Sequence, residues 1–167
     1  MAFIDGMLQE LEQEAQTTRR VLERVPDNRL TWKPHEKSRT LGQLALHIAM
    51  VPGAVAELGT SPSPAQAPQF GEDPSPAKAA DLLPALDESI AKAKKLLGGM
   101  DDGRLMETWR LMNGDRELLA VPRAGFLRAI MLNHWYHHRG QLSVYLRELG
   151  VPVPSIYGPS ADENPFM

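Results

Sequence analysis

Apolar residues recur at helical spacing in four separate segments of the 167-residue chain, and this pattern constrains the fold more than any other feature. In the first segment, steps of four and three residues alternate, as they do along one face of an amphipathic helix. The stripe consists of Ile4, Leu8, Leu11, Ala15, Thr18, Leu22 and Val25. Pro26 directly follows it and would end such a helix. We therefore expect a first helix over about residues 3–25.

The second segment begins with the residues TLGQ, which have the form of a capping box. In such a box the Thr40 side chain caps the first turn, and the Gln43 side chain reaches back to the backbone of Thr40. Pro52 falls inside the apolar stripe that follows, and a proline inside a helix removes one backbone hydrogen bond. The pattern predicts a second helix over about residues 41–58, bent near Pro52.

Residues 59–78 are rich in proline, glycine and serine and have no helical period, so we expect a long surface loop. A loop of this length within a compact domain is more often functional or mobile than idle. The third apolar stripe follows this loop, and Pro84 interrupts its start. We expect the third helix to become regular near Asp81 and to stop at Gly98.

The pattern changes again at residues 108–120, where Asn113 and Gly114 form a dipeptide typical of the turn of a β-hairpin. We expect a small hairpin here, or otherwise an irregular excursion. Pro122 then precedes the last and longest helix, expected over about residues 123–149. The expected apolar face of this helix consists of Phe126, Leu127, Ile130, Met131, Leu142, Tyr145 and Leu149.

Four long helices joined by connections of different lengths predict an all-α fold, a four-helix bundle. The long loop would lie between the second and third helices, and the hairpin or excursion would precede the fourth. A chain of 167 residues is expected to form one domain, over residues 1–167.

Composition narrows the function classes. The chain has no cysteine, which excludes disulfides, thiolate catalysis and cysteine-based metal sites within it. Its N-terminus turns acidic too soon for a signal peptide, and we expect no apolar run to approach the ~18 residues of a membrane span. The net charge is −3 and the basic residues are dispersed, so nucleic acid is not an expected partner. These features predict a cytoplasmic protein without a membrane partner.

Three of the five histidines lie within NHWYHHRGQL, residues 133–142. His134 and His138 are four residues apart, which places them on one face of a helix, and that face continues the apolar stripe. His137 lies about 100° around the helix from His138, at the edge of the stripe. A buried imidazole needs a hydrogen-bond partner or a metal. A backbone carbonyl, a glutamine or a water would satisfy the pair as well as a metal would, so the pair alone leaves both readings open.

His47 adds a third imidazole, because it lies in the middle of the second expected helix and faces inward or nearly so. If the second and last helices are neighbours, His47 meets His134 and His138 across the bundle. Three neutral imidazoles suit zinc, nickel or iron(II) and leave coordination positions open for water or substrate. Because these ligands carry no charge, one bound divalent cation would acidify a bound water or a substrate thiol.

Three stretches together resemble the DinB/YfiT-like family of small bacterial four-helix proteins, which are proposed to be metalloenzymes. They are WKPHEKSRTLGQLALHIA (32–49), NHWYHHRGQLSVYLRELGVP (133–152) and SIYGPSADE (155–163). The resemblance spans nearly the whole chain and includes the order of its elements. It implies a metal triad of one histidine on the second helix and an H-x-x-x-H pair on the last, which are His47, His134 and His138 here.

The resemblance also implies a partner and a cofactor. Homodimers are frequent in this family, so we expect a homodimer. Characterised relatives include transferases that attach a low-molecular-weight thiol to electrophiles and an isomerase that uses mycothiol. A low-molecular-weight thiol is therefore an expected cofactor beside the divalent metal, with a small molecule as the substrate.

The catalytic residues are not assigned by the sequence, beyond a metal-bound water or thiolate as the expected reacting group. His137 is a candidate helper as a base, and Gln141 is a candidate for orienting a ligand imidazole. Arg139 is expected in solvent, and Trp135 is expected to serve packing. Tyr157 is expected to anchor the C-terminal segment across the end of the bundle.

Two classes of function fit these expectations. The first is a metal-dependent enzyme, either a thiol-dependent S-transferase or a metal-dependent hydrolase. The second is a non-catalytic bundle in which the metal only joins the second helix to the last. Dependence of a reaction on metal and thiol separates the two classes.

Overall fold

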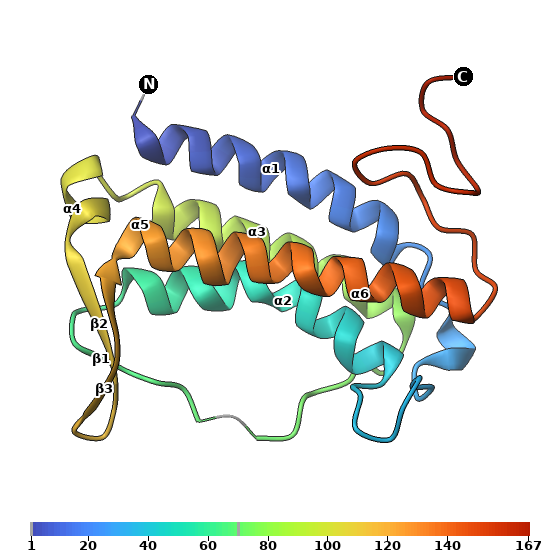
Figure 1. Ribbon diagram of the computed structural model, residues 1–167, viewed down its shortest axis with the longest axis horizontal. Helices are drawn as coiled ribbons and strands as arrows, with labels where there is room; N and C mark the ends of the chain where they lie inside the picture. The colour runs from blue at the N-terminus through green and yellow to red at the C-terminus, as the bar shows by residue number, and fades with distance from the viewer. Residues whose placement is uncertain (1, 70) are drawn as a thin grey trace.

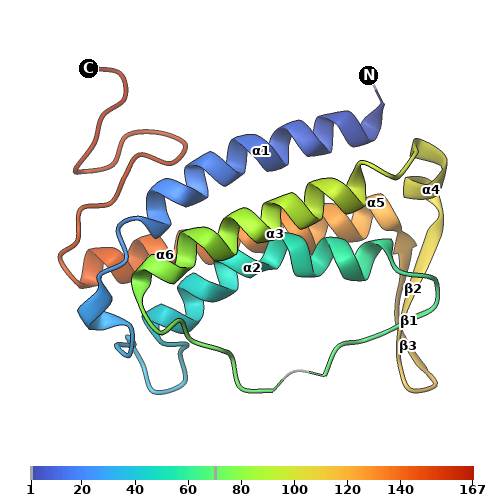
Figure 2. The same ribbon diagram turned by 180° about the vertical axis from the view of Figure 1, so that it is seen from behind.

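The computed structural model describes residues 2–69 and 71–167, and it is mostly helical with one small sheet. The expected 59–78 loop is therefore described apart from Phe70. The long helices are α1 (Phe3–Leu22), α2 (Leu41–Thr60), α3 (Leu82–Leu97) and α6 (His134–Glu148). They lie side by side, with α3 and α6 between α1 and α2 (Figure 1), and Figure 2 shows the same layers from behind. The shorter helical elements are η1 (Asp27–Arg29), η2 (Ala79–Asp81), α4 (Asp102–Met106), α5 (Arg123–Phe126) and η3 (Leu127–Asn133).

The helix ends follow local chemistry. The first helix ends at Leu22 rather than near Val25, because the N–H groups of Arg24 and Val25 bond to carbonyls three residues earlier in a tighter turn before Pro26. The capping box at the start of α2 is confirmed: Gln43 N donates to Thr40 Oγ1 at 3.2 Å, and Thr40 N donates to Gln43 Oε1 at 2.9 Å. The third helix begins and ends where the sequence predicts, from Leu82 to Leu97.

Pro52 lies inside α2, and two side chains from other helices repair the backbone around it. Because Pro52 has no N–H, the carbonyl of Ile48 loses its helical donor. The buried indole of Trp135 donates to that carbonyl instead, at 2.8 Å. On α3, Ser89 Oγ accepts from Gly53 N at 2.8 Å and donates to a second α2 carbonyl. The predicted bend is present (Figure 1), and these bonds hold it against α3 and α6.

α2 is also long and apolar enough, by length and composition alone, to cross a membrane. The expectation that no segment approaches this length is wrong for α2, whose one charged residue is Glu57. Of its most apolar 18-residue window, 56% is buried inside the protein. Packing against α3 and α6 therefore accounts for the apolar character of α2.

The all-α expectation is wrong in one respect, because a three-stranded sheet lies at one end of the helices. Its strands are β1 (Ala65–Gln66), β2 (Thr108–Asn113) and β3 (Arg116–Pro122). β2 and β3 form the predicted hairpin, and β1, from the 59–78 loop, pairs with β2 in parallel. Asn113 pairs with Arg116, so Gly114, with a φ of 58°, is the first turn residue. Trp109 packs on Phe126 with ring centroids 4.5 Å apart, which attaches the sheet to the helices.

The last helical stretch runs from Arg123 to Glu148, but η3 within it is a π-helix of seven residues. The backbone N–H of His134 donates to the carbonyl of Ala129, five residues earlier. This wider turn shifts the register, so Ile130, expected on the apolar face, is 39% exposed. Short π segments are frequent at functional sites, and this one ends directly at His134.

Arg139 is buried, which contradicts its expected place in solvent. Its side chain is 1% exposed and forms an ion pair with Glu14 of α1 at 2.6 Å. Arg139 also donates to Thr18 Oγ1 at 3.0 Å. Tyr157 contacts both members of the pair, and its hydroxyl donates to Glu14 Oε2 at 2.9 Å. This network holds α1, α6 and the C-terminal segment together, as the expected anchoring role of Tyr157 requires.

Candidate metal centre

The structure brings together the three histidines that the sequence singles out. His47 lies on α2, and His134 and His138 lie one turn apart at the start of α6. One nitrogen from each ring lies within 4.8 Å of the other two. The Nε2 atoms of His134 and His138 are 2.6 Å apart. Among the described residues, no other group of three or more potential metal ligands is this compact.

The repaired bend in α2 sets the position of this cluster. Ile48 and Trp135, which share the hydrogen bond across the two helices, directly follow His47 and His134 in the chain. Because Ile48 and Trp135 are both fully buried, this contact fixes the register between α2 and α6. The histidines beside them are therefore held opposite one another.

The three side chains fit a divalent cation on two observations. His47 Nε2 is a buried nitrogen without a hydrogen-bond partner among the described residues. Nitrogens that share a tetrahedral zinc ion lie roughly 3.3 Å apart, which follows from zinc–nitrogen bonds of about 2.0–2.1 Å. The separations in the cluster, from 2.6 Å up to 4.8 Å, bracket this value. Three imidazoles suit zinc, nickel or iron(II).

Electrostatics favour the neutral, metal-binding form of all three rings. Burial is the largest cause that lowers the pKa of His47 and of His138, each from 6.5 to about 4. The positive charge of Arg39 lowers both further. Burial also lowers the pKa of His134. At neutral pH the cluster therefore offers uncharged nitrogens.

Gln141 and His137 differ in their relation to the cluster. Gln141 Oε1 lies 2.7 Å from His138 Nδ1, and since an amide oxygen only accepts, this contact assigns the proton to Nδ1. The Nε2 of His138, 2.6 Å from His134 Nε2, then carries the lone pair that a cation would bind. His137 is exposed, and its ring centroid lies 5.1 Å from that of His138. It borders the cluster on the solvent side.

The sequence did not indicate an ion pair that lies beside the cluster. Arg39 donates to both carboxylate oxygens of Asp73, from Nε at 2.7 Å and from Nη2 at 3.2 Å. Arg39 lies directly before the N-cap Thr40, outside the helical period of α2, so spacing could not identify it. Asp73 comes from the 59–78 loop, where no periodicity predicts its position.

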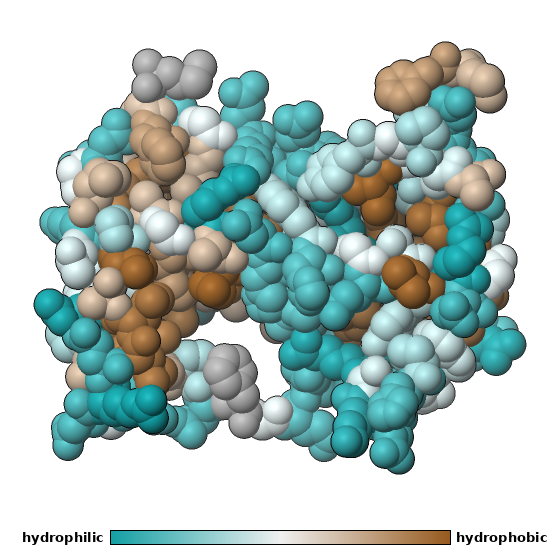
Figure 3. Space-filling model, viewed as in Figure 1, coloured by the Kyte–Doolittle hydropathy of each residue, from teal (hydrophilic) through white to brown (hydrophobic). Residues whose placement is uncertain are grey.

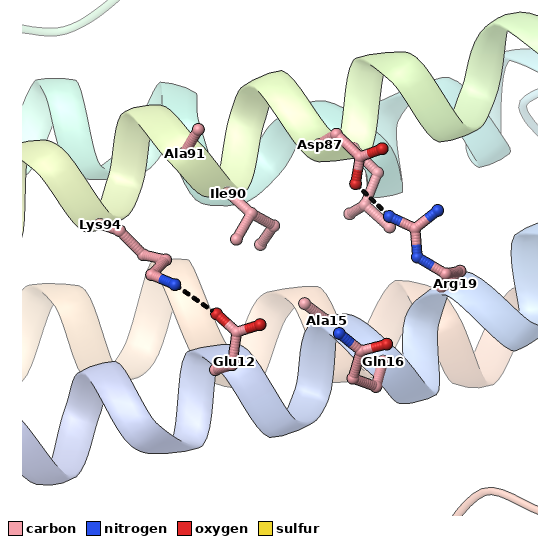
Figure 4. Close-up of a pocket in the computed structure, with 9 residues that line it drawn as sticks. Glu12, Ala15, Gln16, Arg19, Asp87, Ile90, Ala91 and Lys94 are labelled. Atoms are coloured by element: carbon pink, nitrogen blue, oxygen red, sulfur yellow. Dashed lines mark hydrogen bonds and ion pairs between the residues drawn. The ribbon is translucent and has the colours of Figure 1, made fainter.

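A surface groove elsewhere on the molecule has no connection to the cluster. It lies between α1 and α3 (Figure 4) and is crossed by the ion pairs Glu12–Lys94 and Arg19–Asp87. No histidine lines it. We therefore treat it as a solvated seam between two helices.

Fold and site together define a class of small, mostly helical proteins in which three histidines from two helices form a group that could hold a metal ion. The DinB family model matches residues 1–165, so the chain belongs to the DinB family. This match confirms the family that the sequence resembles.

Individual relatives agree with this assignment. YrdA of Bacillus subtilis (strain 168), described as an uncharacterized protein, is 28% identical over 160 residues, which cover 96% of this chain and 91% of YrdA. A DinB-like protein from Bacillus cereus has a similar crystal structure, with a TM-score of 0.72 and 24% identity over 92% of this chain and 97% of that one. A DinB family structure from Exiguobacterium sibiricum gives a TM-score of 0.62 and 21% identity over 97% of this chain and 98% of that one. These structures support the fold.

Proposed function

We propose that this protein is a metal-dependent enzyme that binds one divalent cation through His47, His134 and His138 and transfers a small thiol to an electrophilic substrate. The observation that carries the proposal is the cluster itself, in which three neutral imidazoles from two helices lie within 4.8 Å of one another. A cation bound there would act as a Lewis acid and lower the pKa of a thiol.

The surrounding residues have distinct tasks in this proposal. Gln141 holds the His138 ring in the orientation and tautomer that direct Nε2 toward the cluster. His137, exposed beside His138, accepts the proton of the thiol. The thiol sulfur then forms a bond to the electrophilic carbon, and the leaving group departs with the electrons of its bond to that carbon. A hydrolase would use the same cluster with water in place of the thiol.

A purely structural role for the metal has less support. α2 and α6 are already joined by the hydrogen bond from Trp135 to Ile48 and by a continuous apolar core. A metal is therefore not needed to hold these helices together. His47 and His134 are only partly buried, so the cluster lies close to solvent, from which a ligand can approach. The homodimer and the thiol cofactor are predictions that rest on the family resemblance alone.

Elemental analysis of untagged protein, followed by a thiol-dependence assay, tests the proposal. We expect about one divalent metal per chain in the wild type and a loss of metal in His47→Ala. His35→Ala is the matched control, because His35 lies exposed in a loop. The metal-loaded wild type should conjugate thiols to 1-chloro-2,4-dinitrobenzene faster than metal-free protein does. Full metal content in His47→Ala would contradict the site, and equal rates with and without metal would contradict the reaction.

A further inference from the structure

We propose that Arg39 binds a carboxylate of the ligand that occupies the histidine cluster, and that Asp73 holds this position until the ligand arrives. The inference rests on the proposed function, since it concerns a ligand of the same site. It adds a substrate class, a small molecule that carries a carboxylate beside its reactive group, and a residue that selects it.

The Arg39–Asp73 contact shows how a carboxylate would be held. Two nitrogens of the guanidinium donate to the two carboxylate oxygens, at 2.7 Å and 3.2 Å, which is the paired geometry that arginine makes with carboxylates. The side chains are 33% and 36% exposed, so solvent and a ligand can reach both. An exposed pair of this kind contributes little stability, which makes an exchange of one carboxylate for another inexpensive.

The position of Arg39 connects it to the cluster along both helices. Gln43 and His47 lie four residues apart on one side of α2, and Gln43 Nε2 donates to Asp73 O at 3.1 Å, so the Arg39–Asp73 pair contacts α2 one turn from His47. From α6, the Tyr145 hydroxyl donates to the backbone carbonyl of Arg39 at 3.3 Å. Tyr145 lies two turns beyond His138 on α6. Arg39 therefore stands at the end of the seam between α2 and α6 in which the histidines lie.

Charge supports this placement. The positive charge of Arg39 lowers the pKa of His47, His134 and His138, and the negative charge of Asp73 acts on His47 in the opposite direction. The contacts from Gln43 to Asp73 O and from Tyr145 to Arg39 O place the Arg39–Asp73 pair between α2 and α6, at the end of the seam that holds the histidines. A guanidinium in this position attracts anionic ligands and disfavours cationic ones.

The guanidinium, rather than the start of α2, is the group available to an anion. The backbone N–H of Leu41 donates to Trp32 O at 2.8 Å, and that of Gly42 donates to Leu30 O at 2.9 Å. The N–H of Gln43 is engaged by the cap. The first-turn donors that could bind an anion at a helix start are therefore occupied.

Asp73 is placed so that it can leave. It belongs to the 59–78 loop, which the sheet holds at the other end through Ala67 N and Met112 O, 2.7 Å apart. Near Asp73 the loop contacts α2 through Gln43 Nε2, which donates to Asp73 O at 3.1 Å. Between these attachments an opening separates the loop from the helices (Figure 3). The loop can therefore release Asp73 while its other end stays in the sheet.

Titration of cobalt(II)-loaded protein with three thiols tests the proposal. The probes are 3-mercaptopropionate, 2-mercaptoethanol and cysteamine, which carry an anionic, a neutral and a cationic end. Sulfur-to-cobalt charge-transfer absorption reports binding without any reaction. We expect the anionic thiol to bind about tenfold more tightly than the neutral one. Arg39→Gln should abolish this preference, and Asp73→Asn should raise the affinity for 3-mercaptopropionate by removing the competing carboxylate.

Arg147→Gln is the control, because Arg147 pairs with Asp162 on the surface and has no contact with Arg39. It should leave the preference unchanged. If cobalt binds but the three thiols bind equally, or if Arg39→Gln keeps the preference, the role of Arg39 is wrong and the metal site stands. If the wild type binds no cobalt, both the metal site and this inference are wrong.

Discussion

The indole Nε1 of Trp135 donates a hydrogen bond of 2.8 Å to the backbone carbonyl of Ile48, and this contact joins α6 to α2 next to the histidine cluster. The carbonyl is available because Pro52 has no N–H with which to bond it. A proline that interrupts one helix thus gives the other helix a fixed point of attachment. The placement of His47 opposite His134 follows from this contact.

Trp135→Phe should destabilise the protein by about 1–3 kcal/mol, because it leaves the Ile48 carbonyl buried without a donor. Urea denaturation measures the change. Trp109→Phe is the matched control, since Trp109 is equally buried but its Nε1 has no hydrogen-bond partner among the residues that the structure describes. Cobalt affinity should also fall in Trp135→Phe. Equal stability of the two variants would contradict the account of the repaired bend.

Glu14→Gln should cost about 3–5 kcal/mol of unfolding free energy, because Arg139 is 1% exposed and would keep its charge without a counter-ion. Thermal and urea denaturation both report this loss. The comparison is Glu12→Gln, which removes the surface pair with Lys94 and should change stability by less than about 1 kcal/mol. Similar effects of the two substitutions would show that the buried network does not hold α1 to α6.

Stability of the metal-free protein should fall as the pH is lowered from about 6.5 toward 4. His47 and His138 have folded-state pKa values of about 4, well below the 6.5 of an exposed histidine, so the unfolded chain binds more protons across this window. The stability that the neutral rings contribute is complete above pH 6.5 and is lost as the pH falls. His47→Gln removes one such group. Its unfolding free energy, measured by urea titration from pH 5 to 6.5, should depend less steeply on pH than that of the wild type.

Gln141→Leu should weaken metal binding roughly 10- to 100-fold, because the His138 ring loses the partner that fixes its tautomer and orientation. Competition with a chromophoric chelator measures the affinity. Stability should change little, since Gln141 is exposed. Gln13→Leu, at an exposed position of α1, controls for the added apolar surface. Unchanged metal affinity in Gln141→Leu would show that Gln141 does not orient His138 for metal binding.

Local patterns in the sequence were sufficient to predict the long helices and the histidine cluster. Helical spacing located His134 and His138 on one face, and the capping box at Thr40 located the start of α2. The position of His47 beside His134 and His138 could be expected, because helices of a bundle pack with their inward faces against one another. Amphipathic periodicity and cap chemistry are properties of short stretches of chain, so they can be read without the fold.

The features that the sequence did not reveal depend on contacts between distant segments. β1 comes from a proline-rich loop, and it becomes a strand only by pairing with β2. Arginine is usually a surface residue, so the sequence predicts Arg139 in solvent. In the fold, Glu14, 125 positions away in the chain, balances its charge in the interior. The π-helix before His134 shifts the register of Ile130, and no residue in that stretch is a known signal for such a turn. The Arg39–Asp73 pair likewise needs the folded loop.

A crystal structure with anomalous data collected at the absorption edge of the bound metal tests the central claim most directly. We predict a single strong peak about 2.0–2.2 Å from one ring nitrogen each of His47, His134 and His138. The peak should disappear in His47→Ala crystals and persist in His35→Ala crystals. A peak bound by other residues, or metal-loaded crystals without a peak at these three histidines, would contradict the account.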